Sequence, residues 1–183
     1  MDFNKFSLNN FTKKNQHTRM CIGDAIIELM KDNDFKHIKI SDITKKAGVS
    51  RMTFYTYYHT KEEVVEDYLQ EVIHGYIKLS YGKLSTDFPS YDNILMALNY
   101  FNDYRKFFLG MSRAGLFNML IDAVNKYMDD YIIPNYNVSP YEIYYCAGGI
   151  INMFLKWEEA DCAVSAEDIA KCISAPTMVV QPQ

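Results

Sequence analysis

The sequence has few signals of β-structure. It contains no Asn-Gly or Asp-Gly pair, and no segment alternates cleanly between polar and apolar residues. Those features usually mark hairpins and half-buried strands. Apolar residues make up 49% of the 183 residues, enough for a proper core in one or two domains. Helical periodicity recurs along the chain, so the sequence predicts an all-α protein.

Several kinds of chemistry are also missing. The four cysteines (Cys21, Cys146, Cys162 and Cys172) form no CxxC or Cys/His cluster, and the four histidines show no metal-binding spacing. We therefore expect no metal and no cofactor. No nucleophile elbow, P-loop or paired-carboxylate motif is present, so we expect no enzyme. A redox sensor on Cys146 or Cys162 is left as a minor alternative.

Membrane and export signals are weak. The first residues, MDFNKFSLNNFTKK, are too polar for a signal peptide. Residues 143–157 are nearly all apolar, but about 20 residues are needed to span a bilayer, and Asn152 and Lys156 interrupt the run. We expect no membrane segment and a cytoplasmic location with reduced thiols.

Charge is distributed unevenly along the chain. Residues 1–61 carry 11 Lys and Arg against 6 Asp and Glu, a balance of +5. Residues 62–183 carry 8 against 17, a balance of −9. A basic N-terminal part joined to an acidic remainder is expected when only one part contacts phosphates. The net charge of −4 conceals this asymmetry.

The periodicity of apolar residues predicts the domain organisation. Ile22, Ala25, Ile26, Leu29 and Met30 share one face of a helix over residues 14–31. Later helices are expected over residues 60–83, 90–108, 112–132, 141–159 and 165–174, with a turn at 85–89. The predicted parts are a flexible arm (1–12), a three-helix domain (13–60), a connecting helix (61–84), a larger helical domain (85–176) and a tail (177–183).

Residues 41–61, SDITKKAGVSRMTFYTYYHTK, indicate a helix-turn-helix motif. Gly48 follows a helical run and can adopt the left-handed conformation at low steric cost. Ser50 can cap the second helix. Phe54 and Tyr58, four residues apart, turn inward, which leaves the opposite face of that helix free for the major groove.

The segment AGVSRMTFYTYYHTKE resembles the signature of the TetR family of bacterial transcription regulators. The chain departs from the family at Lys39, where a capping Thr is common, and at Tyr58, where Phe is usual. The resemblance implies base contacts from the early second helix and phosphate contacts around it, although Tyr57 is equally compatible with core packing. The implied DNA-binding residues are Lys39, Ser50, Arg51, Met52, Thr53, Tyr55, Tyr57 and Lys61.

The resemblance also implies a mode of action, with residues 13–60 as the DNA-binding domain and residues 85–176 as the effector-binding and dimerisation domain. Members of the family bind a palindromic operator in double-stranded DNA as homodimers, and a repressor released by a small-molecule effector is the expected form. The segment AGGI ahead of Lys156-Trp157-Glu158-Glu159 resembles a subgroup that includes dihydroxyacetone kinase regulators, so activation stays open. The alternative is an all-α ligand-binding or protein-interaction module without sequence-specific DNA binding.

The C-terminal half contains candidates for an effector pocket and a dimer interface. Aromatic and methionine side chains at helical spacing indicate either core packing or a pocket, and the resemblance favours the pocket. The helix over residues 141–159 is apolar almost all round, so it is either a dimer contact or the central helix of a monomeric core. The pocket candidates are Met96, Tyr100, Tyr104, Phe117, Met119, Tyr145 and Met153. The interface candidates are Gly148, Gly149, Ile151 and Trp157.

Overall fold

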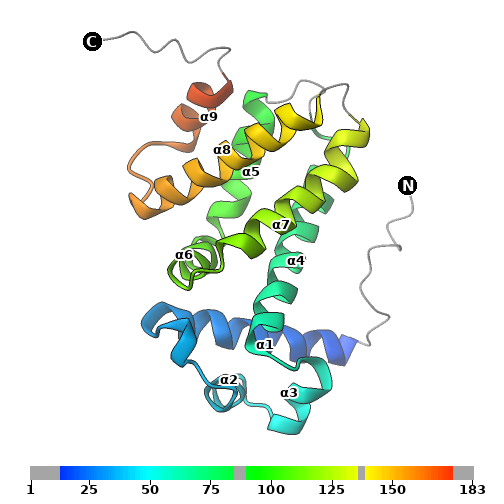
Figure 1. Ribbon diagram of the computed structural model, residues 1–183, viewed down its shortest axis with the longest axis vertical. Helices are drawn as coiled ribbons and strands as arrows, with labels where there is room; N and C mark the ends of the chain where they lie inside the picture. The colour runs from blue at the N-terminus through cyan, green and yellow to red at the C-terminus, as the bar shows by residue number, and fades with distance from the viewer. Residues whose placement is uncertain (1–12, 85–89, 136–138, 175–183) are drawn as a thin grey trace. The chain divides into compact units, whose positions relative to one another are not determined.

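The computed structural model describes residues 13–84, 90–135 and 139–174. Over these ranges the chain is helical and has no strand, so the predicted all-α class is confirmed (Figure 1). The chain divides into two compact units, Met1–Tyr68 and Leu69–Gln183, and the division falls inside helix α4. The expected arm (1–12), turn (85–89) and tail (177–183) lie outside the described residues.

The N-terminal unit is built around a short helical core. Its elements are α1 (Lys13–Asp32), the 3-10 turn η2 (Phe35–His37), α2 (Ile40–Ala47), α3 (Arg51–Tyr57) and the start of α4 (Lys61–Ser80). Helices α2 and α3 lie on the same side of α1 (Figure 1). Ile22, Ala25, Ile26 and Met30 of α1 are buried, as the helical period predicts. Fully buried side chains from the following helices complete the core, namely Ile43, Phe54 and Val65.

The turn between α2 and α3 follows the local sequence. Gly48 ends α2 with φ +68°, in the left-handed region where a side chain would be strained. The Ser50 hydroxyl accepts a hydrogen bond from the Thr53 amide at 2.9 Å. Such a cap contributes about 1 kcal/mol relative to Ala. Both predicted features of this turn are therefore confirmed.

Lys39 stands at the N-cap of α2 without a side-chain hydrogen bond to the helix. Asp42, three residues later, accepts instead from the Lys39 backbone amide at 3.0 Å. Half of a capping box thus compensates for the missing hydroxyl. The start of α4 is similar: Thr60 Oγ1 accepts from the Glu63 amide at 3.2 Å, whereas the Glu63 carboxylate accepts from His59.

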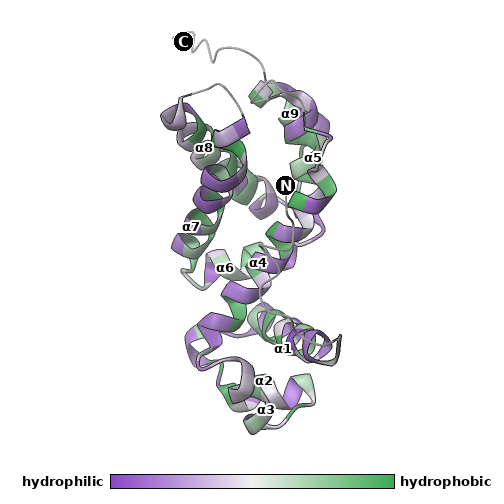
Figure 2. Ribbon diagram, turned by 90° about the vertical axis from the view of Figure 1, so that its right-hand side faces the viewer, coloured by the Kyte–Doolittle hydropathy of each residue, from purple (hydrophilic) through white to green (hydrophobic). Residues whose placement is uncertain are grey.

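The C-terminal unit contains the later part of α4 and five further α-helices within the described ranges. These are α5 (Tyr91–Asn102), α6 (Arg105–Arg113), α7 (Phe117–Tyr127), α8 (Pro140–Glu159) and α9 (Ala166–Ser174). A π-helical turn, η3 (Met128–Ile132), and a 3-10 turn, η4 (Ile133–Asn135), extend α7. Helix α5 packs against α9, and α8 packs against α6 and α7. In Figure 2, α7 and α8 each carry both hydrophobic and hydrophilic residues.

Two predicted helices are wrong in extent. The helix expected over residues 90–108 is divided by a turn at Asp103 and Tyr104, although neither residue is a helix breaker. The helix expected over residues 112–132 begins only at Phe117, because Gly115 ends α6 with φ +71°. Gly115 is the kind of C-terminal glycine that marks a helix end, and the sequence did contain that signal.

Candidate functional site

Helix α3 presents one face outward and buries the other. Phe54 is fully buried, whereas Met52 is 82% exposed and Tyr55 is 51% exposed. Arg51 and Thr56 are also exposed, and Thr53 is partly so. The structure therefore brings Arg51, Met52, Thr53 and Tyr55 together on an accessible helix face.

The inner side of α3 is held by aromatic packing. The rings of Phe54 and Tyr55 meet edge to face at 5.6 Å between centroids. Phe54 also packs on Tyr58, with centroids 5.8 Å apart. The Thr56 hydroxyl donates to the Met52 carbonyl at 3.0 Å, one turn back. These contacts fix the orientation of the exposed face.

Several of the predicted contact residues form side-chain hydrogen bonds inside the unit. The Ser50 hydroxyl lies 2.8 Å from the Thr53 hydroxyl in addition to capping the helix. The Tyr57 hydroxyl donates to Asn15 Oδ1 at 3.2 Å, on α1. Tyr57 is only partly exposed. Its bond to α1 gives it a structural task beside the predicted DNA contact.

Lys61 is held at the base of α4. Its ammonium group donates to the carbonyl oxygens of Phe35 at 2.5 Å and Ile38 at 3.0 Å, and it lies 4.6 Å from the centroid of the Phe35 ring. An ammonium group has three protons, so these bonds use two of them. Lys39, in contrast, extends into solvent at the start of α2.

A polar network that the sequence analysis missed ties α3 to α1 and α4. Arg19 forms an ion pair with the Asp67 carboxylate, and Tyr58 donates to the same carboxylate at 2.5 Å. Burial, together with the nearby Asp67, raises the pKa of Tyr58, so the phenol remains a donor. Arg19 lies on the apolar face of α1 with Ile22 and Ile26. A charged residue on that face is a sequence signal that an acidic partner is buried nearby.

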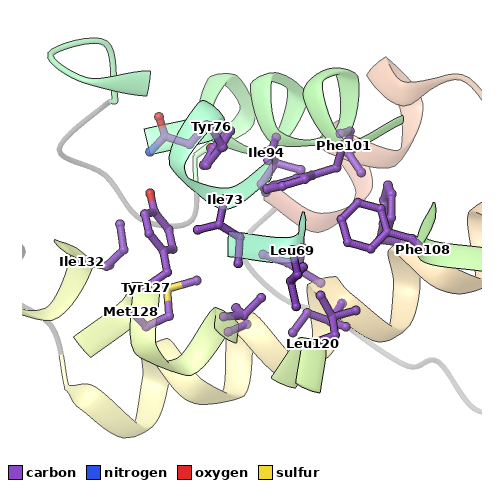
Figure 3. Close-up of a pocket in the computed structure, with 18 of the residues that line it drawn as sticks. Leu69, Ile73, Tyr76, Ile94, Phe101, Phe108, Leu120, Tyr127, Met128 and Ile132 are labelled. Atoms are coloured by element: carbon purple, nitrogen blue, oxygen red, sulfur yellow. The ribbon is translucent and has the colours of Figure 1, made fainter. Parts of the chain in front are cut away.

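The C-terminal unit contains an apolar cavity of about 130 Å³ (Figure 3). It is bordered by α4, α5, α6, α7, η3 and α8. Leu69 and Ile73 of α4 lie between Ile94 and Phe101 of α5 and Leu120 of α7 (Figure 3). The lining contains no Asp, Glu, Lys, Arg or His among the residues that the structure describes.

None of the seven predicted pocket residues borders this cavity. They occupy the same helices but other faces: Tyr145 is 80% exposed and Phe117 is 38% exposed, while the Tyr100 hydroxyl donates to the Val72 carbonyl. Met96, Tyr104, Met119 and Met153 are partly exposed. Residue type suggested them, but the rotation of each helix against its neighbours decides which side chains point inward.

Comparison with known proteins agrees with the helix-turn-helix geometry. The profile of the bacterial regulatory proteins, tetR family, matches residues 22–68, which include α2, α3 and the start of α4. The N-terminal part of the chain, over residues 22–68, is of the TetR type. The profile covers the residues that form the exposed face of α3, together with Tyr58 and Asp67 of the network behind it, whereas Arg19 precedes the match.

Two curated relatives are regulators by name. One is the HTH-type transcriptional regulator YxbF of Bacillus subtilis (strain 168), which is 29% identical over 160 residues. The aligned region is 82% of this chain and 42% of YxbF. The HTH-type dhaKLM operon transcriptional activator DhaS of Lactococcus lactis subsp. lactis (strain IL1403) is 29% identical over 101 residues, 52% of this chain and 49% of DhaS. These matches span less than half the length of either relative.

Solved structures share the fold. A TetR transcriptional regulator from Streptococcus agalactiae 2603V superposes with a TM-score of 0.66 at 18% identity, covering 88% of this chain and 94% of that one. The dihydroxyacetone kinase operon activator DhaS gives a TM-score of 0.58 at 21% identity, covering 85% and 91%. At such identities the likeness concerns the fold alone.

Helix α8 has one buried and one exposed side. Gly148 and Gly149 are exposed, and an added Cβ would meet no atom within 4 Å at either position. Tyr141 and Tyr145 on the same side are 83% and 80% exposed. Two interface candidates are corrected. Ile151 is buried and lines the cavity, and Trp157 is buried with its indole donating to the Val164 carbonyl at 2.7 Å.

A buried ion pair joins α6 to the end of α8. Glu158 is fully buried, and its Oε2 lies 2.7 Å from Nε of Arg105. Arg105 also donates to the Glu158 carbonyl and pairs with Asp161. Burial raises the pKa of the Cys162 thiol beside this pair, as it does that of Cys146. Protonated thiols react slowly with oxidants, which disfavours the redox alternative.

The described part of the chain holds no group of three or more His, Cys, Asp or Glu side chains placed to bind a metal. Among the same residues, no helix is both long and apolar enough to cross a membrane.

Proposed function

We propose that this protein is a cytoplasmic transcription regulator that binds a palindromic operator as a homodimer and is released by a small-molecule effector. The exposure of Met52 on α3, two residues before the fully buried Phe54, is the observation that carries the proposal. A short helix that is anchored on one side and open on the other suits the major groove. The TetR-type match over residues 22–68 supports the same use of this face.

The proposed DNA contacts are of two kinds, to bases and to phosphates, according to where each residue lies on the helix-turn-helix motif. Arg51 is suited to guanine, and the methyl groups of Met52 and Thr53 are suited to the thymine methyl. Tyr55 is placed to donate to a phosphate, as are Lys39 and the remaining proton of Lys61. Ser50 and Tyr57 contribute mainly by holding α3, because their hydroxyls are already bonded within the unit.

The exposed side of α8 is the proposed dimer contact. It combines two exposed tyrosines, Tyr141 and Tyr145, with the small residues Gly148 and Gly149. Large exposed apolar groups beside open backbone favour a close helix crossing with a second copy. Two copies would present two α3 helices to successive major grooves.

Helix α4 is the proposed connection between effector and DNA. Its residues up to Tyr68 belong to the N-terminal unit, and Leu69, Ile73 and Tyr76 border the cavity. An effector that shifts α4 changes the geometry of the dimer, and by linkage DNA must weaken effector binding by the same factor. We propose repression, although the relative DhaS is an activator by name.

Selection from random duplex DNA at physiological salt tests the proposal. We expect an enriched palindrome for the wild-type protein. Met52→Ala should relax the base preference at one position in each half-site, whereas Met20→Ala, at an exposed methionine of α1, should not. Enrichment of no sequence would contradict the proposal and favour a protein-interaction module.

Sedimentation and transcription assays test the other parts. Tyr145→Glu should convert dimers to monomers without lowering thermal stability, while Tyr81→Glu, also at an exposed tyrosine, should leave the dimer intact. Dimers that persist in Tyr145→Glu would exclude the α8 contact. In a reconstituted transcription assay at the selected operator, repression lowers transcript yield; a rise in yield would establish activation instead.

A further inference from the structure

The cavity of the C-terminal unit is apolar on every side that the described residues form. Its polar groups are the Asn93 amide and the hydroxyls of Tyr76 and Tyr127, set among aliphatic and aromatic side chains. Asn93 belongs to the first turn of α5, where its backbone amide bonds to Ser90. A charged ligand would be buried there without an opposite charge, which is strongly unfavourable.

The volume also restricts the ligand. A cavity of about 130 Å³ is close to the roughly 150 Å³ of an engineered apolar cavity that stays dry and accepts benzene. A space of this size destabilises a core, because its lining loses dispersion contacts. A ligand of matching size restores those contacts and so stabilises the folded protein.

Aromatic rings form part of the wall. Phe108 and Phe154 meet edge to face at 5.5 Å between centroids, with an interplanar angle of 89°. Phe101 packs against Phe108 in the same manner at 5.8 Å and 82°. Such a wall offers both ring edges and ring faces to an entering aromatic molecule.

We propose that the cavity binds a small, uncharged, apolar molecule of the size of a monocyclic arene. The inference rests on the proposed function, because it names the chemical class of the effector. The ligand contacts Leu69 and Ile73, so it acts directly on α4 (Figure 3). Acids and phosphorylated metabolites are excluded because the lining has no charged partner for them, and polyols because it has few hydrogen-bonding groups.

Toluene and benzoate are the matched probes, since they share a ring and differ in charge. With the full chain, we expect toluene to raise the thermal midpoint in a saturable manner and benzoate to leave it unchanged. Calorimetric titration should give an affinity at least tenfold higher for toluene. Equal or tighter binding of benzoate would overturn the proposal, as would the absence of toluene binding.

Two cavity variants locate the site. Ala147→Leu fills the cavity and should lower toluene affinity at least tenfold, whereas Ala160→Leu, the same change at an exposed position after α8, should not. Ile150→Ala enlarges the cavity and should shift preference several-fold from toluene towards propylbenzene. The second variant keeps the test decisive if Ala147→Leu fails to fold. Toluene affinity unaltered in Ile150→Ala would place the ligand elsewhere.

DNA binding is measured on the same samples. Selection of a palindrome without toluene binding would overturn the ligand proposal and leave the proposed function in place. Toluene binding that Ala147→Leu abolishes, in a protein that selects no DNA sequence, would support the ligand proposal and contradict the proposed function.

Discussion

The phenolic hydroxyl of Tyr58 lies 2.5 Å from Oδ2 of Asp67, at the point where α3 ends and α4 has completed its first turns. The same carboxylate is paired with Arg19 of α1. Three helices are thereby joined behind the face that we propose for DNA. The Tyr58 hydroxyl, which the phenylalanine usual in the family lacks, donates a hydrogen bond to Asp67.

We expect Tyr58→Phe to lower the free energy of unfolding by about 1–2 kcal/mol, because it removes a hydrogen bond to a charged group. Tyr55→Phe should have the opposite profile, with unchanged stability and weaker DNA binding, since Tyr55 is exposed. Urea unfolding and DNA titration on both variants measure the two effects. Equal stability of Tyr58→Phe and the wild type would show that the bond contributes nothing.

Lys61→Met should destabilise the N-terminal unit by about 1–3 kcal/mol, since it leaves the carbonyls of Phe35 and Ile38 without their cation. If the third ammonium proton of Lys61 donates to a DNA phosphate, the substitution should also reduce the slope of log DNA affinity against log salt concentration by about 1. Lys46→Met, at an exposed lysine of α2, is the control for stability. A salt slope that does not change would assign Lys61 to positioning alone.

Gly75→Ala should destabilise the C-terminal unit. A Cβ at this position would clash with the Tyr100 hydroxyl oxygen, which is held by its bond to the Val72 carbonyl. Overpacking costs about 1–3 kcal/mol and outweighs the gain of about 1 kcal/mol in helix propensity. At Gly148 an added Cβ would meet no atom within 4 Å, so Gly148→Ala should stabilise the monomer through its higher helix propensity.

Thermal unfolding of both glycine variants measures the difference. In a Tyr100→Phe background, the cost of Gly75→Ala should fall because the clashing oxygen is gone. If the losses of stability of Gly75→Ala and Tyr100→Phe simply add in the double variant, the two residues do not interact.

Glu158→Gln should alter the pH dependence of stability. Burial raises the pKa of Glu158 above its ordinary value of 4.5, against the opposing effect of Arg105. The folded protein then binds the proton more tightly than the unfolded chain does. This contribution is complete below pH 4.5 and is lost as pH rises through the folded pKa.

Urea unfolding between about pH 4 and 8 tests this sign. Stability should fall less steeply with rising pH in Glu158→Gln than in the wild type. Glu159→Gln, on the exposed side of α8, should follow the wild type. An unaltered slope in Glu158→Gln would show that this carboxyl does not govern the dependence.

Local sequence was sufficient for the helix-turn-helix motif. Gly48 and Ser50 specify the turn because backbone sterics and a single hydroxyl decide it within a few residues. The buried face of α1 was predictable for a similar reason, since the period of a helix converts spacing into direction. The outward position of Met52 follows from the inward position of Phe54.

Tertiary structure decided the break between α5 and α6. Asp103 and Tyr104 are not helix breakers. Arg105, the first residue of α6, forms ion pairs with Glu158 and Asp161, which lie at and just after the C-terminal end of α8. These contacts join residues more than 50 positions apart. No local propensity contains them, so the sequence predicted one continuous helix.

The sequence by itself determined the helical class, the TetR resemblance of residues 22–68 and the residues of α3, because each depends on short-range periodicity and turn chemistry. Only the tertiary structure decided that Ile151 and Trp157 face inward, that the cavity is bordered by Leu69 and Ile73, and that Lys61 is held by the Phe35 and Ile38 carbonyls. The rotation of each helix about its axis is set by packing against its neighbours, and that packing requires contacts between distant parts of the chain.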